Sequence, residues 1–237
     1  MSRLAALRTE VLKANVELVR QGLVQFAFGN ASGISREDGL VVIKPSGVPY
    51  DRLTAANMVV TDLDGQVHDS ELRPSTDLPT HLALYRAFPD IRGVAHTHSR
   101  FATSWAQAGR EIPCLGTTHA DYFRGPVPVT DPMTAEEIRT AYEWNTGDVI
   151  VRRMALLDPV ECPGVLVYGH GPFSWGASPA DAAHVAGVIE ELAKMAYYTR
   201  MLNPGGGPLD PMLLDKHFLR KHGPGAYYGQ KPKNGHV

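Results

Sequence analysis

Two histidines separated by one residue, His96 and His98, constrain the fold of this chain more than any other feature. They lie in the stretch Gly-Val-Ala-His-Thr-His-Ser, which begins at residue 93 and is predicted to form a strand over 93–98. Alternate side chains of a strand project from the same face of a sheet. Both imidazoles would then lie on one face, close enough to bind a single metal ion.

Two further ligand-type side chains lie where a fold could bring them to this pair. Asp77 lies upstream, at a predicted helix start, and His170 lies downstream, between two glycines and after the apolar run 165–167. Glycines at a strand end let the backbone approach a ligand closely. Three imidazoles and one carboxylate suit zinc or a similar divalent cation better than magnesium, which prefers oxygen ligands. The alternative, two ordinary half-buried histidines at 96 and 98, is weakened by His170. Of the other histidines, two are predicted to have no catalytic part and three stay open: His68 and His184, and then His81, His119 and His222.

The composition is that of an ordinary globular protein. The chain has 237 residues, of which 43% are hydrophobic and 20% charged, and its formal net charge is -2. No polybasic run points to nucleic acid, no stretch approaches the roughly 18 apolar residues of a membrane span, and no signal peptide is evident. We therefore expect a cytoplasmic protein without a nucleic-acid or membrane partner. Cys114 and Cys162 are far apart and are predicted to be buried, reduced thiols.

No repeat or linker divides the chain, which predicts one domain over residues 1–230 and a disordered tail at 231–237. Apolar periodicity and capping residues predict helices over about 4–21, from Asp77 onward, over 101–108, from a capping box at Thr134 to about Trp144, and from Ser178 onward. The last of these carries an apolar stripe that ends at Met195 and is expected to pack on a sheet. Strands are predicted over 40–43, 57–62 and 93–98. Because strands and helices do not alternate regularly, the sequence favours a layered α+β domain.

Three polar segments that contain glycine or begin a helix, at 29–33, 44–47 and 75–76, could form an anion pocket. Lys44 supplies a charge, Ser46 and Thr76 supply hydroxyls, and Gly47 and a helix N-terminus supply free backbone N–H groups. Each segment alone is more typical of a turn or a helix cap. None matches a Walker loop or a Gly-x-Gly-x-x-Gly motif, so a nucleotide is not indicated. Together with a metal site, they favour a small phosphorylated substrate.

Several blocks of residues occur in a fixed order between Leu7 and Gln230. They are Gly29-Asn30-x-Ser32, Lys44-Pro45-Ser46-Gly47, Ser75-Thr76-Asp77 with Pro79-Thr80-His81, His96-Thr97-His98-Ser99, the stretches 116–123 and 169–173, and the stretch 214–230. With these blocks the chain resembles the class II aldolase/adducin superfamily, and within it the family of L-ribulose-5-phosphate 4-epimerases.

The resemblance implies a three-layer α/β/α arrangement of the α+β class, with a central, mostly antiparallel sheet flanked by helices. It implies a C4-symmetric homotetramer whose active sites lie between subunits. The metal would be zinc, or another divalent ion such as manganese or cobalt. Its ligands by this resemblance would be Asp77, His96, His98 and His170.

The same resemblance assigns the remaining site residues. Asp121 and Tyr228 would be the acid/base pair, in an order that the sequence leaves open; without the resemblance, Tyr228 would be taken for a packing aromatic. The adjacent subunit would supply both of them, together with His217 and Arg220. The residues implied to bind substrate or phosphate are Asn30, Lys44, Ser46, Gly47, Ser75, Thr76, Thr117, His217 and Arg220. Thr76 departs from the serine usual in such epimerases, but it keeps the hydroxyl.

The implied reaction interconverts L-ribulose 5-phosphate and D-xylulose 5-phosphate through metal-assisted retro-aldol and aldol steps. One alternative is a class II aldolase that acts on a ketose 1-phosphate of the fuculose or rhamnulose type, but such aldolases carry Glu where this chain has Asp77. A second alternative is a non-catalytic, adducin-like interaction domain, against which the intact histidine set argues. A zinc hydrolase would lack its His-Glu-x-x-His motif here. The pentose pathway, whether arabinose catabolism, ascorbate catabolism or another, stays open.

Overall fold

The computed structural model describes residues 3–68 and 70–229, so the tail predicted at 231–237 lies outside the described residues. The first helix, α1 (Arg3–Arg20), forms where the sequence predicts it. Its buried residues include Leu7, Val11 and Leu18, which recur at the helical period. Gly22, in the left-handed region at φ 70°, follows the end of the helix.

A seven-stranded sheet with the order β4-β3-β2-β1-β5-β7-β6 forms the centre of the described chain. Every neighbouring pair of strands is antiparallel. The strands are β1 (Asn30–Ser35), β2 (Leu40–Ile43), β3 (Val59–Asp62), β4 (Val67–His68), β5 (Gly93–His96), β6 (Gly164–Leu166) and β7 (Pro172–Gly176).

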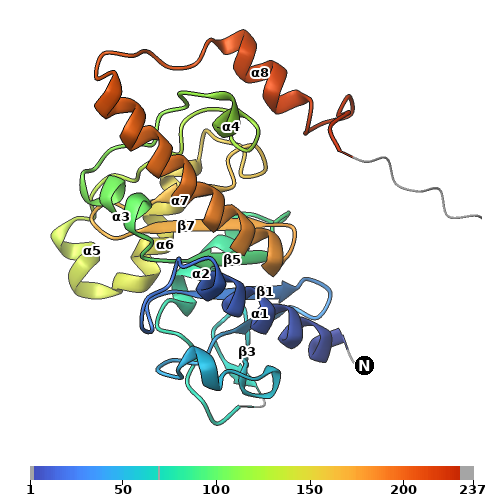
Figure 1. The fold of residues 1–237 in the computed structure, drawn as a ribbon. Helices are drawn as coiled ribbons and strands as arrows, with labels where there is room; N and C mark the ends of the chain where they lie inside the picture. Colours follow the sequence, from blue (N-terminus) through green and yellow to red (C-terminus); the bar gives the residue numbers. More distant parts are fainter. Residues whose placement is uncertain (1–2, 69, 230–237) are drawn as a thin grey trace, which may run out of the picture.

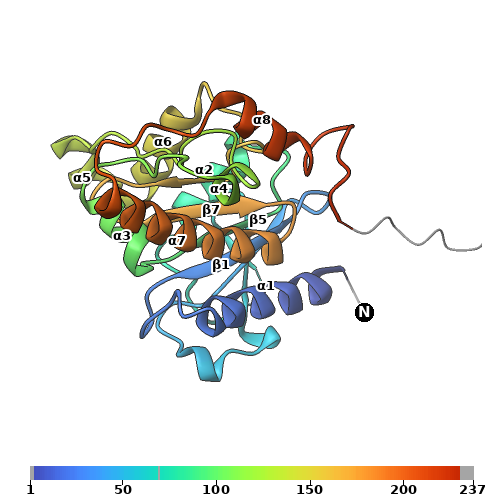
Figure 2. The same cartoon turned by 45° about the horizontal axis from the view of Figure 1, so that its top comes forward.

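Helices cover both faces of this sheet, which gives the three layers seen in Figure 2. Helix α1 and the long helix α7 (Pro179–Leu202) lie on one face, and α2 (Leu78–Ala87) and α6 (Tyr142–Met154) lie on the other. The α+β class and the antiparallel sheet flanked by helices are thereby confirmed. The remaining helices are α3 (Arg100–Gln107), α4 (Thr117–Ala120), α5 (Ala135–Thr140), α8 (Pro211–Leu219) and two short 3-10 helices, Tyr50–Arg52 and Ala55–Asn57.

The central strands alternate their side chains between two apolar cores. Ala31 of β1 and Ala95 of β5 pack with buried alanines of α7 and with Leu18 of α1. The residues next to them in each strand face the other way. One of these, Val94, packs in a second core together with Leu82 of α2. Small side chains on the first face let α1 and α7 lie close to the strands that carry the candidate site.

The helix predicted over 134–144 is divided in two. The Thr134 capping box is present, as predicted, but α5 ends at Thr140 and α6 starts at Tyr142. Ala141 between them adopts φ -137° and ψ 68°, outside the helical region. The side-chain amide of Asn145 donates to the carbonyl oxygen of Glu137 at 2.7 Å and so satisfies a backbone group that a continuous helix would have used.

Two strand ends and one helix residue also differ from the predictions. The strand predicted to reach residue 98 stops at His96, because its partners β1 and β7 extend no further than residues 30 and 172 on that side. Asn57 belongs to a 3-10 turn, so β3 begins two residues later than predicted. Met195, expected to pack on the sheet, is 40% exposed on the surface of α7.

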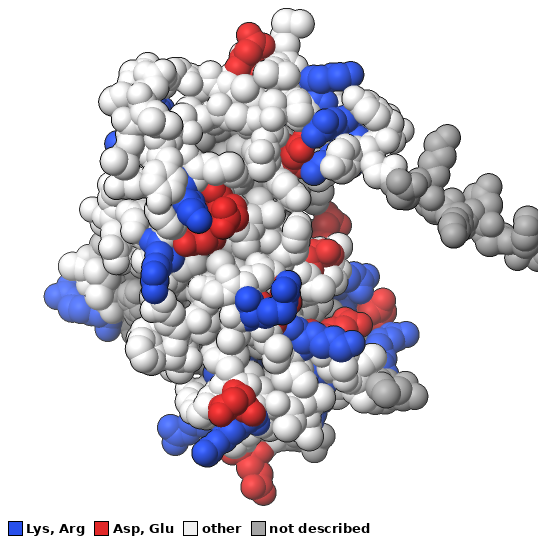
Figure 3. All heavy atoms as spheres, viewed as in Figure 1, with Lys and Arg blue, Asp and Glu red and all other residues white. Residues whose placement is uncertain are grey.

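Three further features concern the surface, the helices and the cysteines. On the face drawn in Figure 3, Lys and Arg side chains are interspersed with Asp and Glu and do not form one basic patch. No described helix is both long enough and apolar enough to cross a bilayer. Cys114 and Cys162 are buried free thiols, as predicted.

Candidate active site

Three histidines meet beside the sheet, where β5 ends and where β6 turns into β7. One ring nitrogen from each of His96, His98 and His170 lies within 4.8 Å of the other two. The Nε2 atoms of His96 and His98 are 3.1 Å apart. The pair therefore converges as predicted, although His98 lies beyond the strand end.

Two glycines allow the backbone segments around these histidines to approach one another. A Cβ atom on Gly171 would lie 2.7 Å from the carbonyl oxygen of Thr97, a distance that real side chains do not tolerate. Gly29 adopts φ 111°, and a Cβ atom there would lie 2.7 Å from the carbonyl oxygen of His96. These glycines let the His170 turn and the start of β1 lie against the His96 to His98 segment.

The ring of His96 is held in one orientation by its surroundings. It stacks on Phe173, with ring centroids 4.1 Å apart and an interplanar angle of 16°. Its Nδ1 lies 3.0 Å from the carbonyl oxygen of Pro172. Since a carbonyl can only accept, Nδ1 carries the proton and Nε2 keeps the lone pair that faces His98.

All three imidazoles favour the neutral form. Burial is the largest cause, and it lowers the pKa of His96 to about 3. Burial likewise lowers the pKa values of His98 and His170, while the negative charge of Asp77 acts in the opposite direction. Neutral imidazole is the form that binds metals.

The donor set fits a divalent cation. Because Nε2 of His96 keeps its lone pair, the 3.1 Å contact is satisfied by a proton on Nε2 of His98 or by a cation bound to both nitrogens. Converging imidazole nitrogens with a nearby carboxylate are the preferred surroundings of zinc and of similar borderline ions.

Asp77 lies at the wall of the same cavity as His96 and His98. It occupies the position before α2, as predicted, but its carboxylate does not cap the helix and instead accepts a 2.6 Å hydrogen bond from Nδ2 of Asn30. Burial acts to raise the pKa of Asp77, but the positive charge that His96 and His81 carry when protonated, and the bond from Asn30, lower it overall. The close group of three nitrogens does not include an oxygen of Asp77. Its role as a fourth ligand stays a prediction.

A polar cavity of about 220 Å³ adjoins the histidines. Backbone contacts join two of its walls, because Ser46 N donates to Arg73 O and Ser75 N donates to Lys44 O, each at 2.9 Å. All six residues predicted for the phosphate pocket line this cavity: Asn30, Lys44, Ser46, Gly47, Ser75 and Thr76.

Lys44 gives this cavity its positive charge. The residue is only 3% exposed, and its Nζ lies 3.2 Å from the carbonyl oxygen of Pro45 and 4.8 Å from the ring centre of Tyr50. No carboxylate of the described residues forms an ion pair with it, and burial lowers its pKa. A buried ammonium without a counter-ion in a cavity is suited to an incoming anion.

The remaining predicted residues form a second cluster, between α4 and α8. Asp121 follows α4 and accepts hydrogen bonds from Nδ1 of His217 at 3.0 Å and from Nη2 of Arg220 at 2.7 Å. Nζ of Lys221 lies 3.4 Å from the same carboxylate. Burial acts to raise the pKa of Asp121, but the hydrogen bonds from Arg220 and His217 and the positive charges of Lys221 and Arg220 lower it overall. Asp121 therefore stays ionised at neutral pH.

Tyr228 and Thr117 complete this second cluster. The guanidinium of Arg220 lies 4.9 Å from the ring centre of Tyr228, and Thr117 is the first residue of α4. Among the described residues, no hydrogen bond joins this cluster to His96, His98 or His170. Figure 1 shows α4 and α8 near each other at the upper end of the molecule, beyond α7.

The three histidines whose role the sequence left open make hydrogen bonds within the fold. His81 is fully buried, and its Nδ1 lies 2.7 Å from Oγ of Ser32. His119 and His222 each place Nε2 near a backbone carbonyl oxygen, that of Gly125 at 2.8 Å and that of Asp121 at 3.0 Å. His68 and His184 are exposed and lie outside the site.

The sequence missed two aromatic residues at the site. Phe28 lines the cavity, with its ring centre 5.9 Å from that of His98, and Tyr142 places its hydroxyl 3.2 Å from Nδ1 of His170. Phe28 could have been predicted from the sequence, because it directly precedes the Gly29 block. Nothing in the sequence around Tyr142 indicates a contact with a residue 28 positions away.

Residues 9–197 match the sequence model of the Class II Aldolase and Adducin N-terminal domain. The chain belongs to this family. It is 55% identical over 225 residues to the L-ribulose-5-phosphate 4-epimerases UlaF of Salmonella paratyphi A and Salmonella typhi, which covers 95% of this chain and 99% of each relative.

Solved structures agree on the fold. An L-fuculose 1-phosphate aldolase superposes with a TM-score of 0.77 at 23% identity, covering 93% of this chain and 97% of the aldolase. The L-fuculose-1-phosphate aldolase of Thermus thermophilus gives a TM-score of 0.66 at 23% identity, covering 86% of this chain and 100% of that one. At this identity the likeness concerns the fold alone.

Proposed function

We propose that this protein is an L-ribulose-5-phosphate 4-epimerase, an isomerase that interconverts L-ribulose 5-phosphate and D-xylulose 5-phosphate. The observation that carries the proposal is the 55% identity to curated epimerases over almost the whole length of both chains. The three converging histidines beside a cavity with a buried lysine support it, because the reaction needs both an electrophile and a phosphate-binding site.

The chemistry of the substrate excludes simple proton removal at the carbon that is inverted. C4 of a 2-ketopentose phosphate has no carbonyl next to it, so its C–H bond is not acidic. A base can instead remove the proton of the C4 hydroxyl, so that the C3–C4 bond breaks and its electron pair moves to C3. The fragments are the enediolate of dihydroxyacetone and glycolaldehyde phosphate. Rotation of the aldehyde and reformation of the bond yield the other C4 epimer.

The histidines would hold the electrophile for this step. A divalent cation on His96, His98 and His170, with Asp77 as the proposed fourth ligand, would polarise the ketose oxygens as a Lewis acid. We place zinc first, with manganese or cobalt as alternatives, because the nitrogen-rich set suits such ions.

The phosphate pocket would keep the cleaved fragment in place. Lys44 offers a charge, the hydroxyls of Ser46 and Thr76 and the backbone N–H of Gly47 offer hydrogen bonds, and the phosphate itself does not react. A fragment held this way rotates inside the site rather than escaping, which keeps the rejoining step intramolecular.

Asp121 and Tyr228 are the proposed acid/base residues. The positive charges of Arg220 and Lys221 beside Asp121 keep it ionised, which suits a proton acceptor. Because neither residue contacts the histidines within one chain, the proposal includes a C4 homotetramer in which a neighbouring subunit supplies both. The tetramer would leave Asp121 beside His217 and Arg220 of its own chain.

An assay of both products tests the function. Purified protein with zinc is mixed with L-ribulose 5-phosphate, and D-xylulose 5-phosphate and free dihydroxyacetone are followed together. The epimer without accumulated fragments is the expected result, and His98→Asn should abolish it together with metal binding. Accumulation of dihydroxyacetone alone would contradict the epimerase and favour a class II aldolase.

A further inference from the structure

His96 and His170 belong to the same cluster, but their rings are held differently. The Nδ1 of His96 faces a backbone carbonyl, and its ring stacks on Phe173. His170 is only partly buried and follows Gly169, which adopts φ 70° in the turn between β6 and β7. Its ring has no backbone partner among the described residues, and the hydroxyl of Tyr142 is the side-chain group that meets its Nδ1, at 3.2 Å.

From this contact we propose that Tyr142 is a positioning residue, which fixes the tautomer and the ring orientation of His170. The inference rests on the proposed role of the histidine cluster in the epimerase. The two rings are nearly parallel, at 19°, with centroids 6.2 Å apart, so that the phenol approaches the edge of the imidazole that carries Nδ1.

Metal binding through Nε2 of His170 would fix which of the two groups donates in this hydrogen bond. If Nδ1 of His170 carries the proton, it donates to the phenol oxygen and leaves Nε2 as a lone pair for a metal. The phenol oxygen of Tyr142 carries lone pairs, so it can accept this bond. In the opposite tautomer, Nε2 would carry a proton and His170 could not bind a metal through it.

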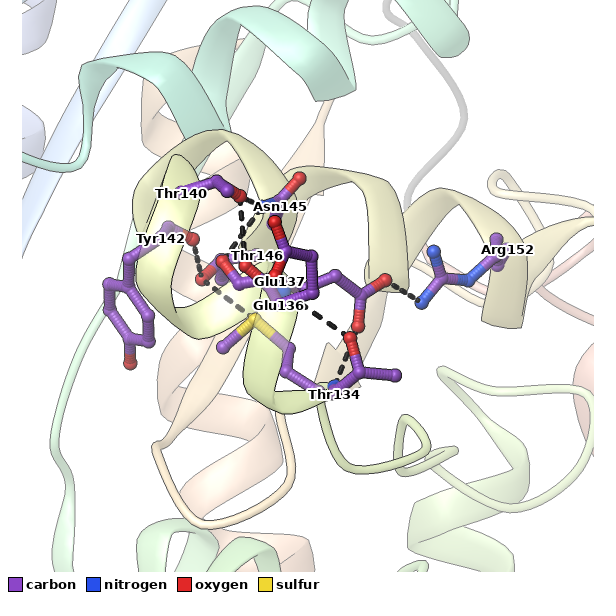
Figure 4. A network of polar contacts seen from close by, with 9 residues as sticks. Thr134, Glu136, Glu137, Thr140, Tyr142, Asn145, Thr146 and Arg152 are labelled. Atoms are coloured by element: carbon purple, nitrogen blue, oxygen red, sulfur yellow. Dashed lines mark hydrogen bonds and ion pairs between the residues drawn. The ribbon is translucent and has the colours of Figure 1, made fainter.

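The break between α5 and α6 determines where Tyr142 lies. Tyr142 is the first residue of α6, directly after Ala141, and its carbonyl oxygen accepts a hydrogen bond from Oγ1 of Thr146 at 2.8 Å. Figure 4 shows its ring pointing away from the polar network that joins the two helices. In a continuous helix over 134–154 the ring would project in another direction.

Polar contacts hold this break in place. Nδ2 of Asn145 donates to Glu137 O at 2.7 Å and to Oγ1 of Thr140 at 3.2 Å, across the junction (Figure 4). Nη2 of Arg152 donates to the carboxylate of Glu137 at 2.8 Å.

A contact with the neighbouring helix ties this junction to Asp77. Oγ1 of Thr80 in α2 donates to the carbonyl oxygen of Glu143 at 2.5 Å. Helix α2 begins directly after Asp77. The same helix pair therefore positions Tyr142 and the proposed carboxylate ligand.

The test compares Tyr142→Phe with Tyr168→Phe. Both variants lose one hydroxyl and keep the ring, and Tyr168 lies in the same turn as His170 but its hydroxyl makes no hydrogen bond to a described residue. Zinc affinity is measured by competition with a chromophoric chelator, and cobalt-substituted protein is examined by visible absorption. Thermal unfolding of the metal-free proteins reports whether each variant folds.

We expect Tyr142→Phe to weaken zinc binding about 10-fold or more and to change the cobalt spectrum, since loss of a partner of a ligating histidine typically costs 10–100-fold. Metal-free Tyr142→Phe should unfold at the same temperature as the metal-free parent protein. Tyr168→Phe should match the parent protein in zinc affinity and in the cobalt spectrum. Unchanged zinc affinity in Tyr142→Phe would overturn the inference, even with lower turnover, because the hydroxyl would then act on the substrate. Zinc affinity is measured without any sugar. Failure of the epimerase assay would therefore reject the proposed function but would leave this inference about Tyr142 standing.

Discussion

The buried lysine of the phosphate pocket allows the sharpest test of how this site binds its substrate. Lys44 is 3% exposed and pairs with no carboxylate of the described residues. Lys44→Met removes the charge but keeps an unbranched apolar side chain of similar length. The variant should therefore fold normally and lose its affinity for the phosphate group.

The expected loss can be worked from the surroundings of Nζ. A unit charge pair about 4 Å apart at an effective dielectric constant near 20 attracts by about 4 kcal/mol. To bind phosphate, Lys44 gives up a 3.2 Å hydrogen bond to Pro45 O, which stabilises by about 1 kcal/mol. The balance is about 3 kcal/mol, or on the order of 10²-fold in kcat/KM. Since the phosphate does not react, most of this loss should appear as a higher KM.

Steady-state kinetics with L-ribulose 5-phosphate measure this effect, and Lys13→Met is the matched control. Lys13 is an exposed residue of α1, so its replacement changes the net charge equally but leaves the pocket intact. Inorganic phosphate should raise the unfolding temperature of the parent and control proteins and have little effect on Lys44→Met. A kcat/KM of Lys44→Met within threefold of the parent value would refute the reasoning, because a charge in contact with phosphate cannot contribute so little.

Two further predictions concern the second cluster. Tyr228→Phe should depress turnover by about 10²-fold or more without changing metal content, and full activity in this variant would exclude the hydroxyl from proton transfer. Asp121→Asn should destabilise the protein at neutral pH by about 1–3 kcal/mol, because it removes an ionised acceptor from Arg220 and His217. The pKa of Asp121 is lowered from its ordinary 3.8. The stabilisation is therefore complete above about pH 4 and is lost as the pH falls through the lowered pKa. Urea unfolding of the parent protein and of Asp121→Asn should show their difference in unfolding free energy shrinking below pH 4. A constant difference down to pH 2 would contradict the role of the Asp121 charge.

Local patterns in the sequence predicted the parts of this structure that depend on near neighbours. The capping box at Thr134 and the helix start at Ser178 are present, because a cap needs only residues three positions apart. The spacing of His96 and His98 placed both rings together even though the strand ends between them. His170 was found because its glycines, directly after an apolar run, indicate a strand end where the backbone can approach a ligand closely.

Features set by distant contacts could not be found this way. The end of β5 is decided by where β1 and β7 begin, and the break at Ala141 by Asn145 reaching back to Glu137. The contact of Tyr142 with His170 follows from that break. The spacing of apolar residues indicates helices and strands, but it carries no information on contacts that polar side chains make between separate parts of the sequence.

The division of the proposed site into two clusters leads to a test of the assembly. The histidines and the phosphate pocket are built on the sheet, whereas Asp121 lies against α8 and contacts neither. If neighbouring subunits combine these halves, His98→Asn has an intact acid/base cluster and Asp121→Asn has an intact metal site. Each variant alone should be inactive.

Mixing the two variants should then restore activity. After denaturation and refolding together in equal amounts, about a quarter of the sites in a ring of four would join an intact pocket to an intact Asp121 from the next subunit. The measurement is epimerase activity of the mixture, with each variant refolded alone as the control. Persistent inactivity of mixed tetramers, verified by their size and by the presence of both variants, would mean that each chain completes its own site. In that case α8 would have to move toward the histidines, because the contacts of Asp121 within one chain hold it elsewhere.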